Sequence, residues 1–198
     1  MTVRLEEGPG WARAISTLAT ASERLKKAED QAVLKEAHFQ RGKMIEGIDS
    51  GAPGGKPWRK HAPLTLLVRR FKGKSGSKIM IATSALRGSV KVVPLPGGAA
   101  FVGANRKVGK VNIAALHDEG RKYSKPWTAR QRRFFFAVLR KAGETRGPRT
   151  KGSGVRKVFL PARPFVGPTI ARWGRPKDVK LRFEKNLAAS MGGLIGKP

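Results

Sequence analysis

The longest regular pattern of hydrophobic and polar positions runs from residue 11 to about residue 48. Its apolar residues recur every three, four or seven positions, the spacing of one helix face, and they are Trp11, Ile15, Leu18, Leu25, Ala32 and Phe39. The pattern predicts one helix over 11–48, roughly 57 Å long at 1.5 Å per residue. Because that length exceeds a compact domain of this size, part of the helix is expected to project or to pack on another subunit. Two shorter helices broken near Gly42 are the alternative.

The rest of the chain alternates between short apolar patterns and breaker residues, which predicts an α+β fold: a small antiparallel sheet packed with helices. Residues 1–10 are expected to form an arm and 49–57 a loop. The next predicted elements, in chain order, are a helix at 63–70, a strand at 78–82, a hydroxyl-capped helical turn at 83–87, and a hairpin with strands at 89–94 and 99–103.

Residues 121–158 form the most basic region. Thr128 and Gln131 have the spacing of a capping box and predict a helix that ends at Gly143. Its run Phe134–Leu139 surrounds the helix axis, which predicts burial on most sides, either within the chain or between subunits. Residues 144–157 are mostly Gly, Ser, Thr, Pro, Lys and Arg, a composition that predicts a mobile basic loop. Such a loop either grips phosphates or is simply solvated. The phosphate-binding candidates of the region are Arg130, Arg132, Arg133, Arg149, Lys151, Arg156 and Lys157.

Two prolines, Pro161 and Pro164, flank Arg163 in the segment 160–169, so the backbone there is predicted to be extended and stiff. Leu160, Phe165 and Val166 supply apolar anchors beside this cation. One helical turn at 170–173 follows, and Asp178 is predicted to cap a last helix. The apolar stripe of that helix is Val179, Phe183 and Leu187, and Gly192-Gly193 ends it.

Composition narrows the function classes. The formal charge of +29 on 198 residues points to an anionic partner: nucleic acid, an acidic protein surface or an anionic membrane. The absence of cysteine excludes disulfides and thiolate metal sites. No apolar run is long enough to span a membrane, and the start of the chain lacks the apolar core of a secretory signal, so a cytosolic protein is expected. We predict a single domain over 1–198: arm 1–10, long helix 11–48, α+β core 49–170, and C-terminal helix and tail 171–198.

Three catalytic or ligand-binding motifs fail on inspection. Gly55-Lys56 lacks the upstream glycine and the following Ser or Thr of a phosphate loop. The adjacent residues His117, Asp118 and Glu119 point in different directions on any regular element, so a capped, hydrogen-bonded structural histidine is predicted instead of a metal site. The Ser-x-x-Lys pattern at 75–78 lacks its supporting motifs. No enzyme activity, cofactor or metal is therefore predicted.

Four landmarks nevertheless follow one another in a fixed order. They are Gly55-Lys56-Pro57-Trp58; Ile79-Met80 with Thr83-Ser84-Ala85-Leu86-Arg87-Gly88-Ser89; Ala114-Ala115-Leu116-His117-Asp118-Glu119-Gly120; and Leu160-Pro161-Ala162-Arg163-Pro164-Phe165-Val166-Gly167. This succession, over about 39–169, resembles the virion-morphogenesis proteins of tailed phages, of the tail-completion type that includes those of Mu-like phages. Ser84 departs from the pattern, because the family usually has glycine after the threonine. The long helix and the basic loop are elaborations on it.

The resemblance implies a non-enzymatic protein of the virion, assembled in the host cytoplasm. Such proteins form rings, commonly sixfold, between the head connector and the tail tube, or act as tail terminator rings. By this resemblance the structural and interface residues are Trp58, Leu86, His117, Gly120, Pro161, Arg163, Pro164 and Phe165. Arg163 is expected to bond a carboxylate or carbonyls of the sheet or of the next subunit. The rival hypothesis is a nucleic-acid-binding protein that grips the phosphate backbone; contact with phage DNA would join the two.

Overall fold

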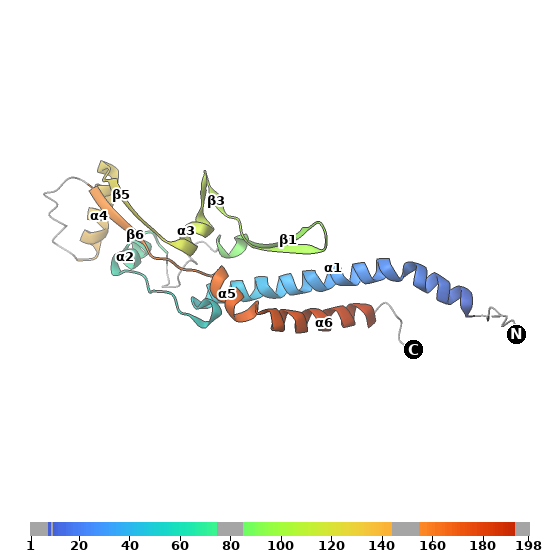
Figure 1. The fold of residues 1–198 in the computed structure, drawn as a ribbon. Helices are drawn as coiled ribbons and strands as arrows, with labels where there is room; N and C mark the ends of the chain where they lie inside the picture. Colours follow the sequence, from blue (N-terminus) through green and yellow to red (C-terminus); the bar gives the residue numbers. More distant parts are fainter. Residues whose placement is uncertain (1–7, 9, 75–84, 144–154, 193–198) are drawn as a thin grey trace.

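The computed structural model describes residue 8 and residues 10–74, 85–143 and 155–192, and it is an elongated α+β fold (Figure 1). The strand predicted at 78–82, nearly all of the arm at 1–10 and residues 144–154 of the basic loop lie outside the described residues. The elements in chain order are α1 (Trp11–Ser50), η1 (Pro53–Gly55), α2 (Pro63–Phe71), η2 (Arg87–Ser89), β1 (Val90–Leu95), β2 (Ala99–Ala104), β3 (Lys107–Val108), β4 (Val111–Asn112), α3 (Ile113–Glu119), β5 (Arg121–Pro126), α4 (Ala129–Lys141), β6 (Val155–Leu160), α5 (Val166–Trp173) and α6 (Pro176–Gly192).

Helix α1 confirms the long helix predicted from the apolar stripe, and it runs unbroken past Gly42. It ends at Gly51, whose left-handed backbone (φ 69°) lets its N–H reach the carbonyl oxygens of the last turn. The second half of α1 buries one face through Ala28, Ala32, Ala37, Met44 and Ile48. The first half extends past the end of α6 (Figure 1) and leaves its apolar residues in solvent. The expected projection of this helix is therefore present.

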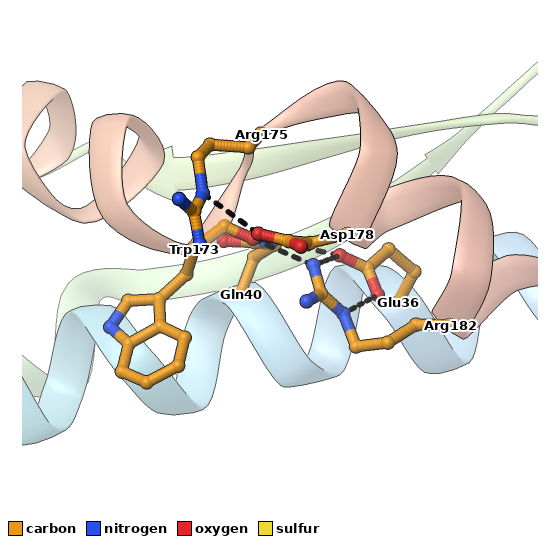
Figure 2. A network of polar contacts seen from close by, with 6 residues as sticks. All are labelled: Glu36, Gln40, Trp173, Arg175, Asp178 and Arg182. Atoms are coloured by element: carbon orange, nitrogen blue, oxygen red, sulfur yellow. Dashed lines mark hydrogen bonds and ion pairs between the residues drawn. The ribbon is translucent and has the colours of Figure 1, made fainter.

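Helix α6 runs antiparallel to α1 and is joined to it by a network of polar contacts (Figure 2). Two nitrogens of Arg182 donate to the two oxygens of Glu36, at 2.8 and 2.7 Å. The same guanidinium and the amide of Gln40 donate to the carbonyl oxygen of Trp173, at 2.6 and 2.9 Å. The hydrogen bond to Glu36 raises the pKa of Arg182 above its ordinary value. Residues 146 positions apart in the sequence thus fix α1 against the α5–α6 pair.

Strands β1 and β2 confirm the predicted hairpin, with Val90 opposite Ala104 and Leu95 opposite Ala99. One face lies on α1: Val90 is fully buried, and Nε of Arg41 donates to its carbonyl oxygen at 2.9 Å. The other face carries three large apolar side chains in solvent, namely Val93, Leu95 and Phe101. Because side chains of a strand alternate between the two faces, this hairpin is apolar on both sides.

The described strands form three separate two-stranded antiparallel sheets, not the single small sheet that was predicted. In the third of them Arg121 of β5 lies opposite Leu160 of β6, and Pro126 lies opposite Val155. Residues 155–157, predicted to belong to the basic loop, are therefore strand. Pairing with β5 supplies the backbone hydrogen bonds of this strand, which the composition of the segment does not predict.

Helices α2 and α4 pack together beside β5 and β6 at the end of the molecule opposite α6 (Figure 1). The capping box of Thr128 and Gln131 is present at the start of α4, as predicted. Val138 is buried, but Phe136 is half exposed, so the predicted burial on most sides of this helix is wrong within the single chain. Only α2 covers α4 among the described helices, and one neighbour cannot enclose a helix.

Three further local predictions need correction. The helical turn expected at 83–87 lies partly outside the described residues, and the described turn is η2, which occupies the start of the predicted strand at 89–94. The turn expected at 170–173 is the end of a longer helix, α5. Helix α6 begins at Pro176, so Asp178 is in its first turn and accepts a bond from Arg175 at 2.8 Å, where the sequence predicted a cap.

Candidate functional site

The segment 160–169 is held against the end of α3 by two hydrogen bonds that its main-chain N–H groups donate. The N–H of Arg163 donates to the carbonyl oxygen of His117 at 2.7 Å. The N–H of Phe165 donates to Oδ1 of Asp118 at 2.9 Å. Phe165 precedes α5, so this carboxylate sits at the positive end of that helix, where a negative charge is stabilising. The α3 end thus fixes the direction of the segment on both sides of Pro164.

Apolar contacts lock the same segment into the core. Phe165 is 1% exposed and belongs to a buried cluster with Met44, Ile48, Trp58, Leu86, Val90 and Ala114. Nε1 of Trp58 donates to the carbonyl oxygen of Pro164 at 2.9 Å, which satisfies the one polar atom of the indole ring. Trp58, Leu86 and Phe165 are therefore core residues of this chain rather than exposed interface residues.

Gly120 shows why the α3 end and the proline segment must meet closely. Its backbone has φ 72°, and a Cβ there would lie 2.5 Å from the nitrogen of Ala162 and 2.8 Å from the oxygen of Leu160. No other residue type fits both the left-handed backbone and that distance. The glycine predicted as a landmark is thus a close-approach position between two segments 40 residues apart in the sequence.

Arg163 itself is a buried cation that has no acidic partner among the described residues. Only 6% of the residue is exposed, its Nε is closed off from solvent without a hydrogen-bond partner, and no recorded ion pair includes it. Burial lowers the pKa of Arg163 below its ordinary value. A buried guanidinium without a partner is unfavourable, since desolvation is not compensated. The exposed 6% is the part that another chain can reach.

His117 lies beside this cation and differs from the prediction made for it. Its carbonyl oxygen accepts a hydrogen bond, but Nδ1 of its ring is buried without a partner in the described part of the chain. Burial, and then the positive charge of Arg163, lower the pKa of His117. The imidazole is therefore kept neutral. The buried Arg163 and the half-buried His117 thus lie together, and each has one buried nitrogen without a hydrogen-bond partner in the described residues.

The structure gathers the predicted motif residues into one region and leaves the predicted phosphate-binding residues elsewhere. Pro161, Arg163 and Pro164 lie in the segment that contacts His117, Gly120 and the Trp58 cluster. Arg130, Arg132 and Arg133 are exposed on α4, far along the β5–β6 pair (Figure 1). Arg156 and Lys157 lie in the first half of β6, where only the backbone is described, and Arg149 and Lys151 lie outside the described residues.

Sequence reasoning missed the residues that hold the helices together. The pairing of Glu36 with Arg182 and the bond from Arg41 to Val90 join segments distant in sequence, and no local pattern signals them. No bond from Asp118 to the proline segment was predicted, whereas its carboxylate accepts a hydrogen bond from the main-chain N–H of Phe165. In the described ranges no group of His, Cys, Asp or Glu could hold a metal ion, and no helix is long and apolar enough to cross a membrane.

No protein-family model, curated protein or solved structure matches this chain. The resemblance to tail-completion proteins therefore stays a prediction from the order and content of the motifs.

Proposed function

We propose that this protein is a structural, non-enzymatic subunit of a ring in the neck of a tailed bacteriophage virion, where it completes the tail and joins it to the head. The phage part of the proposal rests on the ordered motifs, of which Pro161-Ala162-Arg163-Pro164-Phe165 is the most specific. Its proposed partners are further copies of itself, as a hexamer, together with the head connector and the tail tube.

One observation supports the assembly part: the single chain leaves two separate apolar surfaces uncovered. In the described residues, eleven hydrophobic residues are buried while fifteen large ones are exposed. One surface, the α1 tip, consists of Trp11, Ile15 and Leu18, which are 52%, 52% and 74% exposed. The other is the outer face of the β1–β2 hairpin, with Val93, Leu95 and Phe101 at 44–48%. Contiguous apolar surface of this kind marks contacts with other chains.

Two different surfaces on one subunit are what a ring requires. In a ring, each subunit presents one patch to the neighbour ahead and another to the neighbour behind, and the contact is heterologous. A twofold dimer would need only one self-complementary patch. We therefore assign the α1 tip of one subunit to a surface of the next. Arg163 adds a directional contact, because a carboxylate or carbonyl of a neighbouring chain would meet the small part of this residue that stays exposed.

The proposal is tested first in particles. Electron microscopy of virions produced without this gene product is expected to show filled heads and separate tails. Normal, complete virions would refute the joining role.

A second test uses the purified protein and its α1 tip. Light scattering is expected to give a mass several times the 21.5 kDa of one chain for the wild type and a lower mass for Leu18→Glu. Thr20→Glu is the matched control, because it lies two positions away on the opposite side of the helix and is also exposed. Equal masses for wild type and both variants would exclude the α1 tip from assembly.

A third test separates the assembly role of Arg163 from a folding role. Because Arg163 has no acidic partner within the described chain, Arg163→Ala should weaken assembly more than it lowers the melting temperature of the monomer. Comparable loss of monomer stability would mean that the guanidinium acts within the chain.

A further inference from the structure

Positive charge in this molecule is concentrated in one region, which we call the basic lobe. It consists of residues 63–74, 121–143 and 155–160, that is α2, β5, α4 and β6 with the residues that follow α2 and α4. These three ranges contain four, eight and two Lys and Arg residues, and no Asp or Glu. By contrast, α1 and α6 together carry eleven Lys and Arg against eight Asp and Glu. The lobe therefore holds about half of the excess positive charge, 14 of 29, in about a fifth of the chain.

The ion pairs recorded for the described residues lie outside the basic lobe. Every recorded ion pair lies on α1 or α6 or beside them: Lys43–Glu46, Arg87–Asp49, Arg175–Asp178, Lys180–Glu184 and Arg182–Glu36. The described ranges of the lobe offer no carboxylate at all. Side chains that repel one another at short range raise the free energy of the folded state. An anionic partner would remove that repulsion.

Helix α4 places three of its four arginines near its N-terminus, where the helix dipole disfavours a cation. Arg130, Arg132 and Arg133 are all exposed in its first turns, where the helix end is positive, and that turn contains no acidic residue. Arg130, Arg133 and Arg140 recur at intervals of three and seven residues and so form a row along one side, about 15 Å long at 1.5 Å per residue. These cations lower the stability of the helix at its N-terminus. Residues that lower local stability in this way are typical of binding sites.

Aromatic side chains pack together beneath this charged surface. Phe134 of α4 meets Phe71 of α2 edge-to-face at 5.5 Å between ring centroids, and Phe135 meets Trp127 at 5.1 Å. Lys72 lies over the ring of Phe134 at 5.4 Å, and Lys141 over that of Phe71 at 5.7 Å. The two helices and the end of β5 are thus held together while their cations stay at the surface. The charges are presented on a packed element instead of on a free chain.

From this segregation of charge we infer that the basic lobe binds the phosphodiester backbone of a nucleic acid. Duplex DNA carries one negative charge per about 1.7 Å of its axis, so a length equal to the α4 row carries about nine. The charge density of duplex DNA is therefore a far better match for the fourteen cations of the lobe than the charge density of an acidic protein surface. Eight of the fourteen are arginines, whose planar fork suits phosphate oxygens. No base-reading motif accompanies them, so binding is independent of sequence. The inference holds whether or not the protein forms a neck ring.

The test is fluorescence anisotropy with a labelled ~30-base-pair duplex and a single strand of the same length, at salt concentrations from about 50 to 200 mM. Wild-type affinity is expected to fall about a thousandfold over this range, as for six or more phosphate contacts. The two probes distinguish duplex from single strand as the source of the backbone. The salt-dependent fall is expected for at least one of them.

The decisive variant is Arg130→Gln/Arg132→Gln/Arg133→Gln. It should flatten the slope of log affinity against log salt by about 2 to 3 and weaken binding at least tenfold at low salt. The matched control is Arg24→Gln/Lys27→Gln/Lys185→Gln, which removes the same charge from exposed positions of α1 and α6 and should change affinity less than about twofold. Circular dichroism establishes that both variants are folded.

Three results would overturn the inference. One is an equal loss in the two triple variants, which would make binding a matter of net charge alone. Another is an affinity that hardly changes with salt for either probe. The last is competition by polyglutamate as effective as that by unlabelled DNA at equal charge concentration, which would assign the lobe to an acidic protein.

Discussion

The helical stalk, which consists of α1 and α6, and the basic lobe are held together by different physical means. In the stalk, oppositely charged residues pair, and a bidentate Glu36–Arg182 contact lies between the helices with side chains only 12% and 25% exposed. In the lobe, every charged residue of the described ranges is positive, and edge-to-face aromatic contacts supply the cohesion. The difference shows that the lobe, unlike the stalk, carries charge that lowers its stability. The stalk is stabilised by paired charges, whereas the cations of the lobe repel one another.

The largest effect is expected from breaking the polar network of the stalk. Glu36→Ala should lower the free energy of unfolding by about 3 kcal/mol, since Arg182 and Gln40 both lose their buried acceptor. Urea denaturation measures the change. Glu184→Ala is the control, because its pair with Lys180 is long and exposed and should matter by less than about 0.5 kcal/mol. Similar losses in the two variants would mean that the network does not hold the stalk.

The corresponding change in the lobe should be smaller and confined to it. Phe134→Ala removes two edge-to-face contacts and should ease the opening of α2 and α4 by about 2 kcal/mol. Hydrogen exchange of the α2 and α4 amides reports this opening, while the amides of α1 should exchange as before. Phe136→Ala, at a half-exposed position of the same helix, should have little effect. Faster exchange in α1 as well would show that the two regions unfold together.

A pH effect is expected at the junction of the two regions, where His117 lies. Its pKa is lower in the folded protein than in the unfolded chain, so the unfolded chain binds the proton more readily. Stability is therefore complete above about pH 6.5 and decreases as the pH falls below that value. One proton changes the free energy by at most about 1.4 kcal/mol per pH unit, and by less here because the ring is only half-buried.

Thermal unfolding at pH 7 and pH 5 measures this dependence. His117→Gln should remove most of the part of the pH dependence that His117 causes. His38→Gln, at an exposed position of α1, should leave the pH dependence unchanged. An identical pH profile for wild type and His117→Gln would place the dependence elsewhere.

The smallest effect should come from salt. Raising sodium chloride from about 20 to 300 mM shortens the screening length several-fold and weakens repulsion among the cations of the basic lobe. Protection of the α2 and α4 amides should rise by up to about 1 kcal/mol, and that of α1 by less, since its charges are nearly balanced. An equal gain in both regions would remove the electrostatic contrast between them.

Local patterns carried much of the fold. The apolar spacing predicted α1, the two short apolar runs at 89–94 and 99–103 predicted the hairpin, and Thr128 with Gln131 predicted the start of α4. Each of these depends on residues a few positions apart, where helix and turn preferences decide the outcome. Strand β6 was partly mistaken for loop, because its Arg and Lys residues resemble a solvated segment and its partner strand begins 34 residues earlier.

The residues of the candidate site were predictable from the sequence, but their burial, hydrogen bonding and protonation were not. The motif residues were chosen from the sequence, and Gly120, Trp58 and Phe165 prove to contact the proline segment or the cluster around it. That Arg163 would be buried without an acid, with a neutral histidine at its side, depends on three-dimensional packing and on the distribution of carboxylates in space. No spacing along the chain encodes those facts.

The separation of charge along an elongated molecule also determines how it arrives at a target. Because the basic lobe at one end is strongly positive and the stalk at the other is nearly neutral, the chain would experience a torque near any polyanion and turn before contact (Figure 1). If the lobe binds nucleic acid as inferred above, the chain would dock lobe first, with the α1 tip pointing outward. Copies that arrive along one strand then share an orientation, and the apolar side chains of Trp11, Ile15 and Leu18 are presented in parallel. The polyanion would thereby act as an alignment template for the contacts between subunits.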